Sequence, residues 1–202
     1  MEILFIPILV VVFVIITVFI YRKYRKKKYV SNKKKEEKIV SKITMITAKS
    51  DVLTFNIGGS GKCTIDWGDG TSELLTLTSY PSQMYTHSYI GTSTRTITIT
   101  YENITHISFY EQLSGLDLSG CATLQSLICY DTQLTNLDIS GCTALQSLTC
   151  FDTKLTNLDV SSCTALSFLQ CKFNSQLTNL NVKGCKALLN LDCSYNQLSS
   201  AS

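Results

Sequence analysis

Histidine is scarce in this sequence, and its scarcity argues against catalysis. Two histidines occur in 202 residues, His87 and His106, and neither lies in a motif with a nucleophile. The glycine-rich run over residues 58–61 lacks the following lysine of a phosphate-binding loop and therefore predicts a turn. We expect no catalytic residue, no cofactor and no enzyme activity.

Closely spaced cysteine pairs are also absent. The sequence has nine cysteines, but none belongs to the C-x-x-C pair that is typical of a metal site. Eight of them recur at fixed intervals, which would place equivalent thiols about 4.8 Å apart with parallel side chains in a stacked fold. Parallel side chains suit a disulfide badly, so we expect free, buried thiols and no bound metal. Such thiols are compatible with a reducing compartment but do not require one.

Charge is sparse and unevenly distributed. Charged residues make up 16% of the chain, and the net charge is +3. Ten Lys or Arg and two Glu lie between Arg22 and Lys38, whereas the chain from residue 39 on is mildly acidic. We expect no nucleic-acid partner, because the basic charge is confined to one run beside a hydrophobic segment. That run is suited instead to anionic lipid headgroups.

The hydrophobic segment covers residues 3–20 and contains no charge. At about 1.5 Å per residue it spans roughly 27 Å, close to the thickness of a bilayer core. We interpret residues 1–21 as a transmembrane helix and residues 22–41 as the basic juxtamembrane linker of a single-pass membrane protein. A cleaved signal peptide fits less well, because Glu2 is acidic and no small-residue cleavage site follows. The basic run favours a globular part on the cytoplasmic side.

Residues 42–103 are rich in β-branched residues that alternate with polar ones, and Gly, Pro and Ser separate the runs. This pattern predicts a small antiparallel β-sandwich. Asp69 and Gly70 are expected to supply the positive φ angles of a tight hairpin. Asp66, Asp69 and Glu73 are interpreted as turn residues rather than calcium ligands, because the ligand spacing of an EF-hand loop is absent.

Three elements of this region resemble the PKD-type immunoglobulin-like domain. They are the turn Trp67-Gly-Asp-Gly-Thr71, the step His87-Ser-Tyr89 and the alternating strand over residues 96–100. The resemblance implies a spacer or adhesive module without a catalytic site. It also implies that one or two of the strands usual in that family are missing.

Residues 104–202 repeat themselves every 21 or 22 residues, with the pattern Leu-x-x-Leu-x-Cys-x-x-(Asn/Thr)-x-Leu. Such a period predicts a stacked leucine-rich-repeat solenoid with parallel strands, in which residues 104–109 form a degenerate first unit. We expect Asn196 to bond turn backbone, and the threonines at the equivalent positions, Thr132 and Thr153, to do so only partly. The aspartate column, defined as Asp117, Asp138 and Asp159, is expected to accept turn N–H groups.

The predicted fold is therefore mainly β, with an N-terminal transmembrane helix, a small PKD-like β-sandwich and a leucine-rich-repeat solenoid. This combination resembles bacterial cell-surface leucine-rich-repeat proteins, and the resemblance implies extracellular adhesion or recognition. The basic run points to the cytoplasmic side instead, so the side of the membrane stays open.

Residues that flank the Leu-x-Cys strands are expected to point to solvent. Consecutive exposed aromatics on such a ladder predict a binding face for another protein or a surface glycan. The alternative is that these aromatics merely cover one another as a cross-strand stack. The predicted binding residues are Tyr110, Tyr130, Phe151, Phe168, Ile128, Gln170 and Lys172.

The chain ends at Ser202, directly after a full repeat and without a polar capping unit. The ends of a solenoid expose apolar surface and unpaired strand edges. A second hypothesis is therefore a self-associating scaffold protein at the membrane, which would pair through this repeat end. The same observation is also expected of a shortened form of a longer repeat protein.

Overall fold

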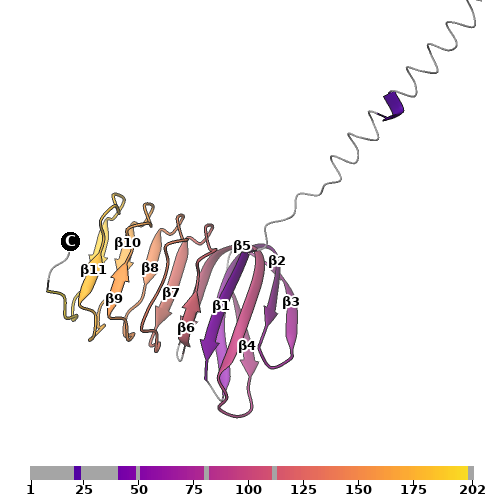
Figure 1. Ribbon diagram of the computed structural model, residues 1–202, viewed down its shortest axis with the longest axis horizontal. Helices are drawn as coiled ribbons and strands as arrows, with labels where there is room; N and C mark the ends of the chain where they lie inside the picture. Colours follow the sequence, from indigo (N-terminus) through magenta and orange to yellow (C-terminus); the bar gives the residue numbers. More distant parts are fainter. Residues whose placement is uncertain (1–20, 24–40, 49–50, 80–81, 111–112, 200–202) are drawn as a thin grey trace, which may run out of the picture. The chain divides into compact units, whose positions relative to one another are not determined.

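The computed structural model describes residues 21–23, 41–48, 51–79, 82–110 and 113–199 (Figure 1). The chain divides into a unit over residues 1–39 and a second unit over residues 40–202. The predicted transmembrane helix over residues 1–21 and the basic linker over residues 22–41 lie almost wholly outside the described residues.

The predicted single-pass membrane localisation needs correction. Within the ranges that the structure describes, no helix is long and apolar enough to cross a membrane, which contradicts that prediction. The helical residues described in the first unit run from Tyr21 to Lys23, which is less than one helical turn, and two of the three are charged.

The second unit begins with six strands that form a β unit. Buried and exposed residues alternate along them, as in β1, where Ile43, Met45 and Thr47 are buried. The six strands are β1 (Ser41–Thr47), β2 (Val52–Asp66), β3 (Ser72–Leu77), β4 (Gln83–Ser88), β5 (Arg95–Tyr110) and β6 (Leu113–Asp117).

The long strands β2 and β5 pair antiparallel and organise this unit. β4 pairs with the first half of β2, and β3 pairs with its second half. A register shift falls at Gly58 and Gly59, where a Cβ on Gly59 would lie 2.1 Å from the Asn103 carbonyl oxygen. All six strands belong to one hydrogen-bonded sheet, which differs from the predicted two-sheet sandwich. The reason is that β2 and β5, at 15 and 16 residues, are long enough to bend and carry partners along both halves.

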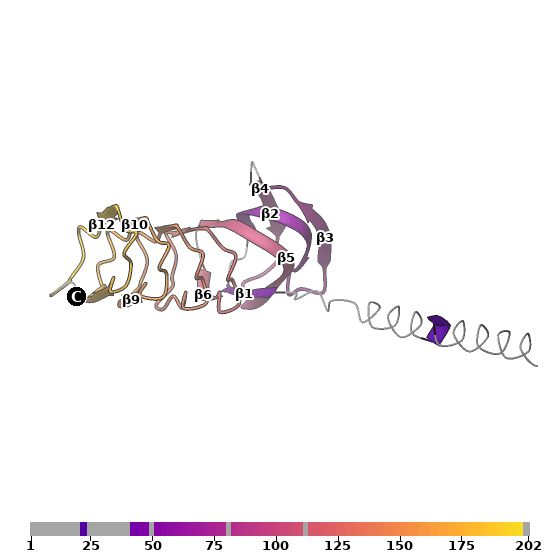
Figure 2. The same ribbon diagram turned by 90° about the horizontal axis from the view of Figure 1, so that it is seen from above.

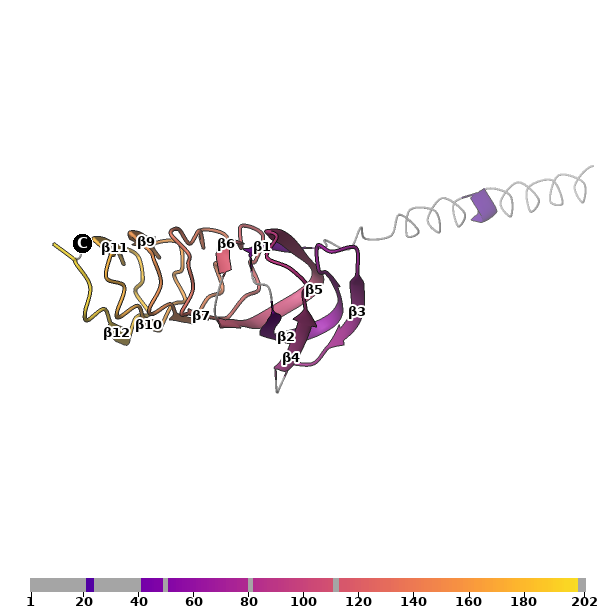
Figure 3. The same cartoon turned by 90° about the horizontal axis from the view of Figure 1, so that it is seen from below.

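Short parallel strands then stack into a solenoid, as the repeat predicts (Figures 2 and 3). The first ladder continues from β5 through β7 (Ser126–Tyr130), β8 (Ser147–Thr149), β10 (Phe168–Gln170) and β12 (Asn190–Asp192). On the return segments, β9 (Asn157–Asp159) pairs with β11 (Asn179–Asn181), and Asp117 forms a parallel bridge to Asp138. These pairings make up the second ladder.

Strand β5 joins the β unit to the solenoid. Its first half pairs antiparallel with β1, and His106–Tyr110 pairs parallel with β7. β1 also pairs with β6, the last residue of which, Asp117, bridges to Asp138, so the β unit connects to the solenoid at both ladders. β5 thus runs without interruption across the predicted domain boundary at residues 103 and 104 (Figure 1). The β unit therefore covers the N-terminal end of the solenoid.

Leucine and cysteine columns fill the interior. All nine cysteines are free, as predicted, and seven of them are buried. Three thiols of one column donate to a carbonyl of the preceding coil: Cys142 Sγ to Leu118 O at 3.7 Å, Cys163 Sγ to Ile139 O at 3.7 Å and Cys185 Sγ to Val160 O at 3.1 Å. Burial raises the pKa of Cys129 and Cys142 to about 12, so these thiols stay protonated at neutral pH.

A buried asparagine closes the third coil. Asn174 is fully buried, and its Nδ2 donates to the carbonyls of Cys150 and Cys171 at 2.8 and 2.9 Å. Asn196 makes the equivalent bonds to Cys171 O and Cys193 O, which confirms its predicted role. The sequence interpretation missed Asn174, because an extra residue follows it before the next leucine. Thr132, at the equivalent position of the first coil, has a buried hydroxyl without a hydrogen-bond partner.

Candidate functional site

The outward face of the first ladder forms three rows of side chains. Strand register places equivalent residues side by side, so that Tyr110 lies beside Tyr130 and Ser108 beside Ile128. The same register continues through β8, β10 and β12, where Phe168 lies between Ser147 and Asn190. Because neighbouring strands of a ladder are about 4.8 Å apart, each row is a regular, closely spaced series.

The predicted aromatic row exists as a stack. The ring centroids of Tyr110 and Tyr130 are 5.0 Å apart, and those of Tyr130 and Phe151 are 4.8 Å apart with planes within 4°. All three side chains are half-buried. Asn56 Nδ2 of β2 donates to Tyr110 Oη at 3.1 Å and fixes the end of the row. The parallel contact of Tyr130 with Phe151 covers one face of each of these rings, whereas the Tyr110 ring is tilted by 59° to that of Tyr130.

The structure brings all seven predicted residues onto this one face. Ile128 and Gln170 are half-buried and lie in the middle row. Phe168 begins β10 and is 38% exposed, whereas Lys172 follows the end of the same strand. Phe168 therefore lies at the opposite edge of the face from Lys172 and the aromatic row.

A second aromatic stack escaped the sequence interpretation. Phe173 and Tyr195 stack with centroids 4.5 Å apart and planes within 7°, and they are 47% and 73% exposed. Both have positive φ, at 57°, and so do Asp131 and Asp152 at the equivalent positions of earlier coils. The signal in the sequence was the replacement of two aspartates by two aromatics at one repeat position.

One ion pair lies beside this second stack. Lys172 Nζ is 3.6 Å from Asp192 Oδ2 and 5.6 Å from the centre of the Phe173 ring. Hydrogen bonds from Ser194, followed by the lysine charge, hold the pKa of Asp192 below its usual value. The face in the third and fourth coils thus combines apolar edges with fixed charges of both signs.

The WGDGT motif forms a separate cluster in the β unit. His87 stacks on the buried Trp67 ring at 4.5 Å, and its Nε2 lies 2.7 Å from Asp69 Oδ2. Asp69 also accepts from Thr71, and these bonds, with His87, hold the pKa of Asp69 far below its usual value. Tyr89 Oη donates to the Trp67 carbonyl at 2.8 Å. These contacts connect the β2–β3 turn to β4, so the cluster has a structural role.

The turn of this motif differs in one detail from the sequence prediction. Positive φ occurs at Gly68 and Gly70, and not at Asp69. The Asp69 carboxylate instead stabilises the turn by accepting from the Thr71 N–H. Asp66 does the same by accepting from the Gly68 N–H at 2.9 Å. The interpretation of both aspartates as turn residues is therefore confirmed.

The aspartate column behaves as predicted. Asp117, Asp138 and Asp159 each accept a backbone N–H from the serine two residues later, at 2.8 to 3.0 Å. These bonds lower the pKa of all three carboxyl groups. Within the described part of the chain, no group of three His, Cys, Asp or Glu side chains is placed to hold a metal ion.

No family model and no curated protein matches this sequence. Among solved structures, the functional domain of InlJ from Listeria monocytogenes, which is described as including a cysteine ladder, is 24% identical to this chain. The likeness covers 44% of this chain and 23% of that chain, with a TM-score of 0.39. The strand pairing within this chain is what establishes the solenoid fold.

Proposed function

We propose that this protein is a binding module that captures another protein through the outward face of its first ladder. The observation that carries this proposal is the pair of ordered aromatic stacks, Tyr130 with Phe151 and Phe173 with Tyr195. Aromatic side chains are enriched among the residues that contribute most to binding. Rings already held by stacking lose little conformational freedom when a partner docks.

The exposed parts of these rings favour a protein over a glycan. Sugars pack against the open faces of aromatic rings, but here stacking covers one face of each of these four rings. Ring edges, the partly exposed Phe168 and the half-buried Ile128 present apolar groups that suit protein side chains. Mutual stacking and partner binding are therefore compatible roles of the same rings.

The β unit is proposed to act as the cap of the solenoid. Its strands β1 and β5 continue both ladders, so they satisfy the backbone groups of the first coil. This role requires no adhesive site in the β unit itself.

A photo-crosslinking experiment tests the binding face. A photoreactive amino acid would replace Ile128 on the face, or Thr156, which is exposed on the return segment of the third coil. We expect the Ile128 probe to crosslink a defined partner and the Thr156 probe to give none. The double substitution Tyr130→Ala with Phe151→Ala should abolish the crosslink, whereas Thr135→Ala with Thr156→Ala should not. Equal crosslinking by both double variants would refute the assignment.

A further inference from the structure

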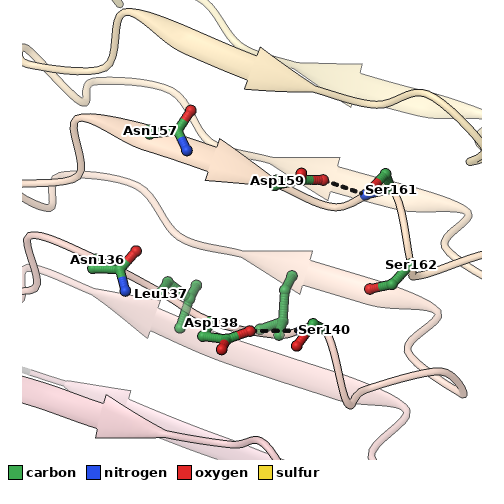
Figure 4. Close-up of a pocket in the computed structure, with 9 residues that line it drawn as sticks. Asn136, Leu137, Asp138, Ser140, Asn157, Asp159, Ser161 and Ser162 are labelled. Atoms are coloured by element: carbon green, nitrogen blue, oxygen red, sulfur yellow. Dashed lines mark hydrogen bonds between the residues drawn. The ribbon is translucent and has the colours of Figure 1, made fainter.

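The second ladder is interrupted between two neighbouring coils. The first and second coils are bridged at Asp117 and Asp138, and the third and fourth coils pair through β9 and β11. Across the described residues of this ladder, no backbone pairing joins Asn136–Asp138 to β9. A cleft of about 410 Å³ lies there instead, within the roughly 300–1,000 Å³ range of small-ligand sites (Figure 4).

The contacts on either side show that the interruption is local. Lys154 N donates to Leu134 O at 3.0 Å before the cleft, and Cys163 Sγ donates to Ile139 O at 3.7 Å beyond it. Between the third and fourth coils, Thr178 N donates to Thr156 O at 3.0 Å, close to the start of the paired strands. The second and third coils therefore stay joined at both ends of the cleft.

The turn column, defined as Gly120, Gly141, Ser162 and Gly184, has its one serine beside this cleft. The other coils have glycine at this position, and a Cβ on Gly141 would lie 2.0 Å from the Ser119 carbonyl oxygen. A Cβ on Gly184 would lie 2.9 Å from the Ser161 carbonyl oxygen. The third coil has Ser162 here, so its turn cannot approach the second coil so closely. Ser162 itself lines the cleft, between the two rungs (Figure 4).

The lining of the cleft is polar and has no positive charge. Asn136 and Asn157 contribute amides, and Asp138 and Asp159 contribute carboxylates whose Oδ1 atoms already accept turn N–H groups. A phosphate or carboxylate ligand would meet two ionised aspartates without a compensating cation. The remaining groups can accept from and donate to a neutral ligand that carries several hydroxyl groups.

We propose that this cleft binds a sugar ring, with the amides of Asn136 and Asn157 and the Oδ2 atom of Asp138 engaging its hydroxyl groups. The site lies on the return segments and does not use the first-ladder face, so it goes beyond the proposed protein-binding function. The absence of an aromatic platform in its lining predicts weak affinity, in the millimolar range.

The test is an NMR titration of the isotope-labelled full chain with glucose, galactose, mannose and N-acetylglucosamine, each added separately. We expect at least one sugar to shift the amide signals of Asn136, Asp138 and Asn157. Ser162→Gly should let the two coils close and should weaken binding by about tenfold or more. Ser175→Gly, a matched change at an exposed turn, and Asn179→Ala, on the paired rung, should leave the affinity unchanged.

Two further variants keep the test independent of the serine. Asn136→Ala and Asn157→Ala change exposed side chains, so they should fold normally and each weaken binding several-fold. The proposal is overturned if none of the four sugars shifts these signals, or if shifts appear only elsewhere. It is equally overturned if Asn157→Ala and Asn179→Ala bind alike, or if calcium ions alone produce the same shifts.

Discussion

Replacing Asn174 with alanine should destabilise the solenoid more than any exposed substitution. The Asn174 side chain is fully buried, and its Oδ1 accepts from Thr153 N at 2.7 Å and from Thr153 Oγ1 at 2.6 Å. Its Nδ2 donates to the carbonyls of Cys150 and Cys171. Alanine would leave the Thr153 N–H, the Thr153 hydroxyl and the Cys150 carbonyl without these partners in the interior, whereas the Cys171 carbonyl keeps its bond from Asn196 Nδ2.

The magnitude follows from those lost bonds. A buried polar group left unsatisfied costs about 1–3 kcal/mol, and two backbone groups and one hydroxyl donor lose their partner here. Partial relaxation and entry of water reduce the sum, so we expect a loss of about 3–5 kcal/mol in the free energy of unfolding. Such a loss is a large part of the roughly 5–15 kcal/mol that stabilises a typical domain.

Urea denaturation of the full chain, followed by circular dichroism, measures this loss. The matched control is Asn179→Ala, which removes an exposed amide whose hydrogen bond to Thr178 Oγ1 is long, at 3.4 Å. The control should change stability by less than about 0.5 kcal/mol. If Asn174→Ala and Asn179→Ala had equal midpoints and equal slopes, the reasoning about the buried amide would be refuted.

Three further predictions concern stability and thiol chemistry. Thr132→Asn should raise the thermal midpoint and add about 1 kcal/mol to the free energy of unfolding, because an amide there can reach turn carbonyls that the unpaired hydroxyl does not. A lower midpoint would contradict this prediction. The folded-state pKa values of Asp69 and the aspartate column lie below their unfolded values, so their stabilisation is present at neutral pH and is lost as pH falls through the folded values. Urea midpoints should therefore decline between about pH 5 and about pH 2, and constant midpoints would count against the turn bonds. Under native conditions iodoacetamide should modify the half-buried Cys185 and Cys193 first and leave Cys129 unmodified, as mass spectrometry would show; rapid labelling of Cys129 would disprove its burial.

The repeat register could be predicted from the sequence because it depends on local chemistry alone. A leucine or cysteine at a fixed interval has one favourable place, inside a stacked coil, and the strand pairing puts Cys150 between Cys129 and Cys171. The turn bonds of the aspartate column were predictable for the same reason, since an Asp side chain reaches a backbone N–H two residues later.

Features that depend on long-range pairing were not predictable. The sandwich prediction treated residues 42–103 as self-contained, whereas β5 pairs with strands on both sides of residue 103. The Phe173–Tyr195 stack needs a left-handed backbone conformation, which the aspartates at the same repeat position favour but which aromatic residues alone do not predict. The contrast between Ser162, which lines the cleft, and the glycines of neighbouring turns becomes meaningful only when the distances from those glycines to the carbonyl oxygens are known.

Because β5 is continuous, an error in its strand alignment would affect both the β unit and the solenoid. Its first half sets the alignment of β1 and β2, and its second half sets the alignment of β7, from which each later coil takes its own position. A slip of one residue in β5 would turn buried side chains outward in the cap and in the first coil together. The pairing of β2 with β5 therefore fixes the alignment of the β unit and of β7 together, and each later coil of the solenoid inherits that alignment from the coil before it.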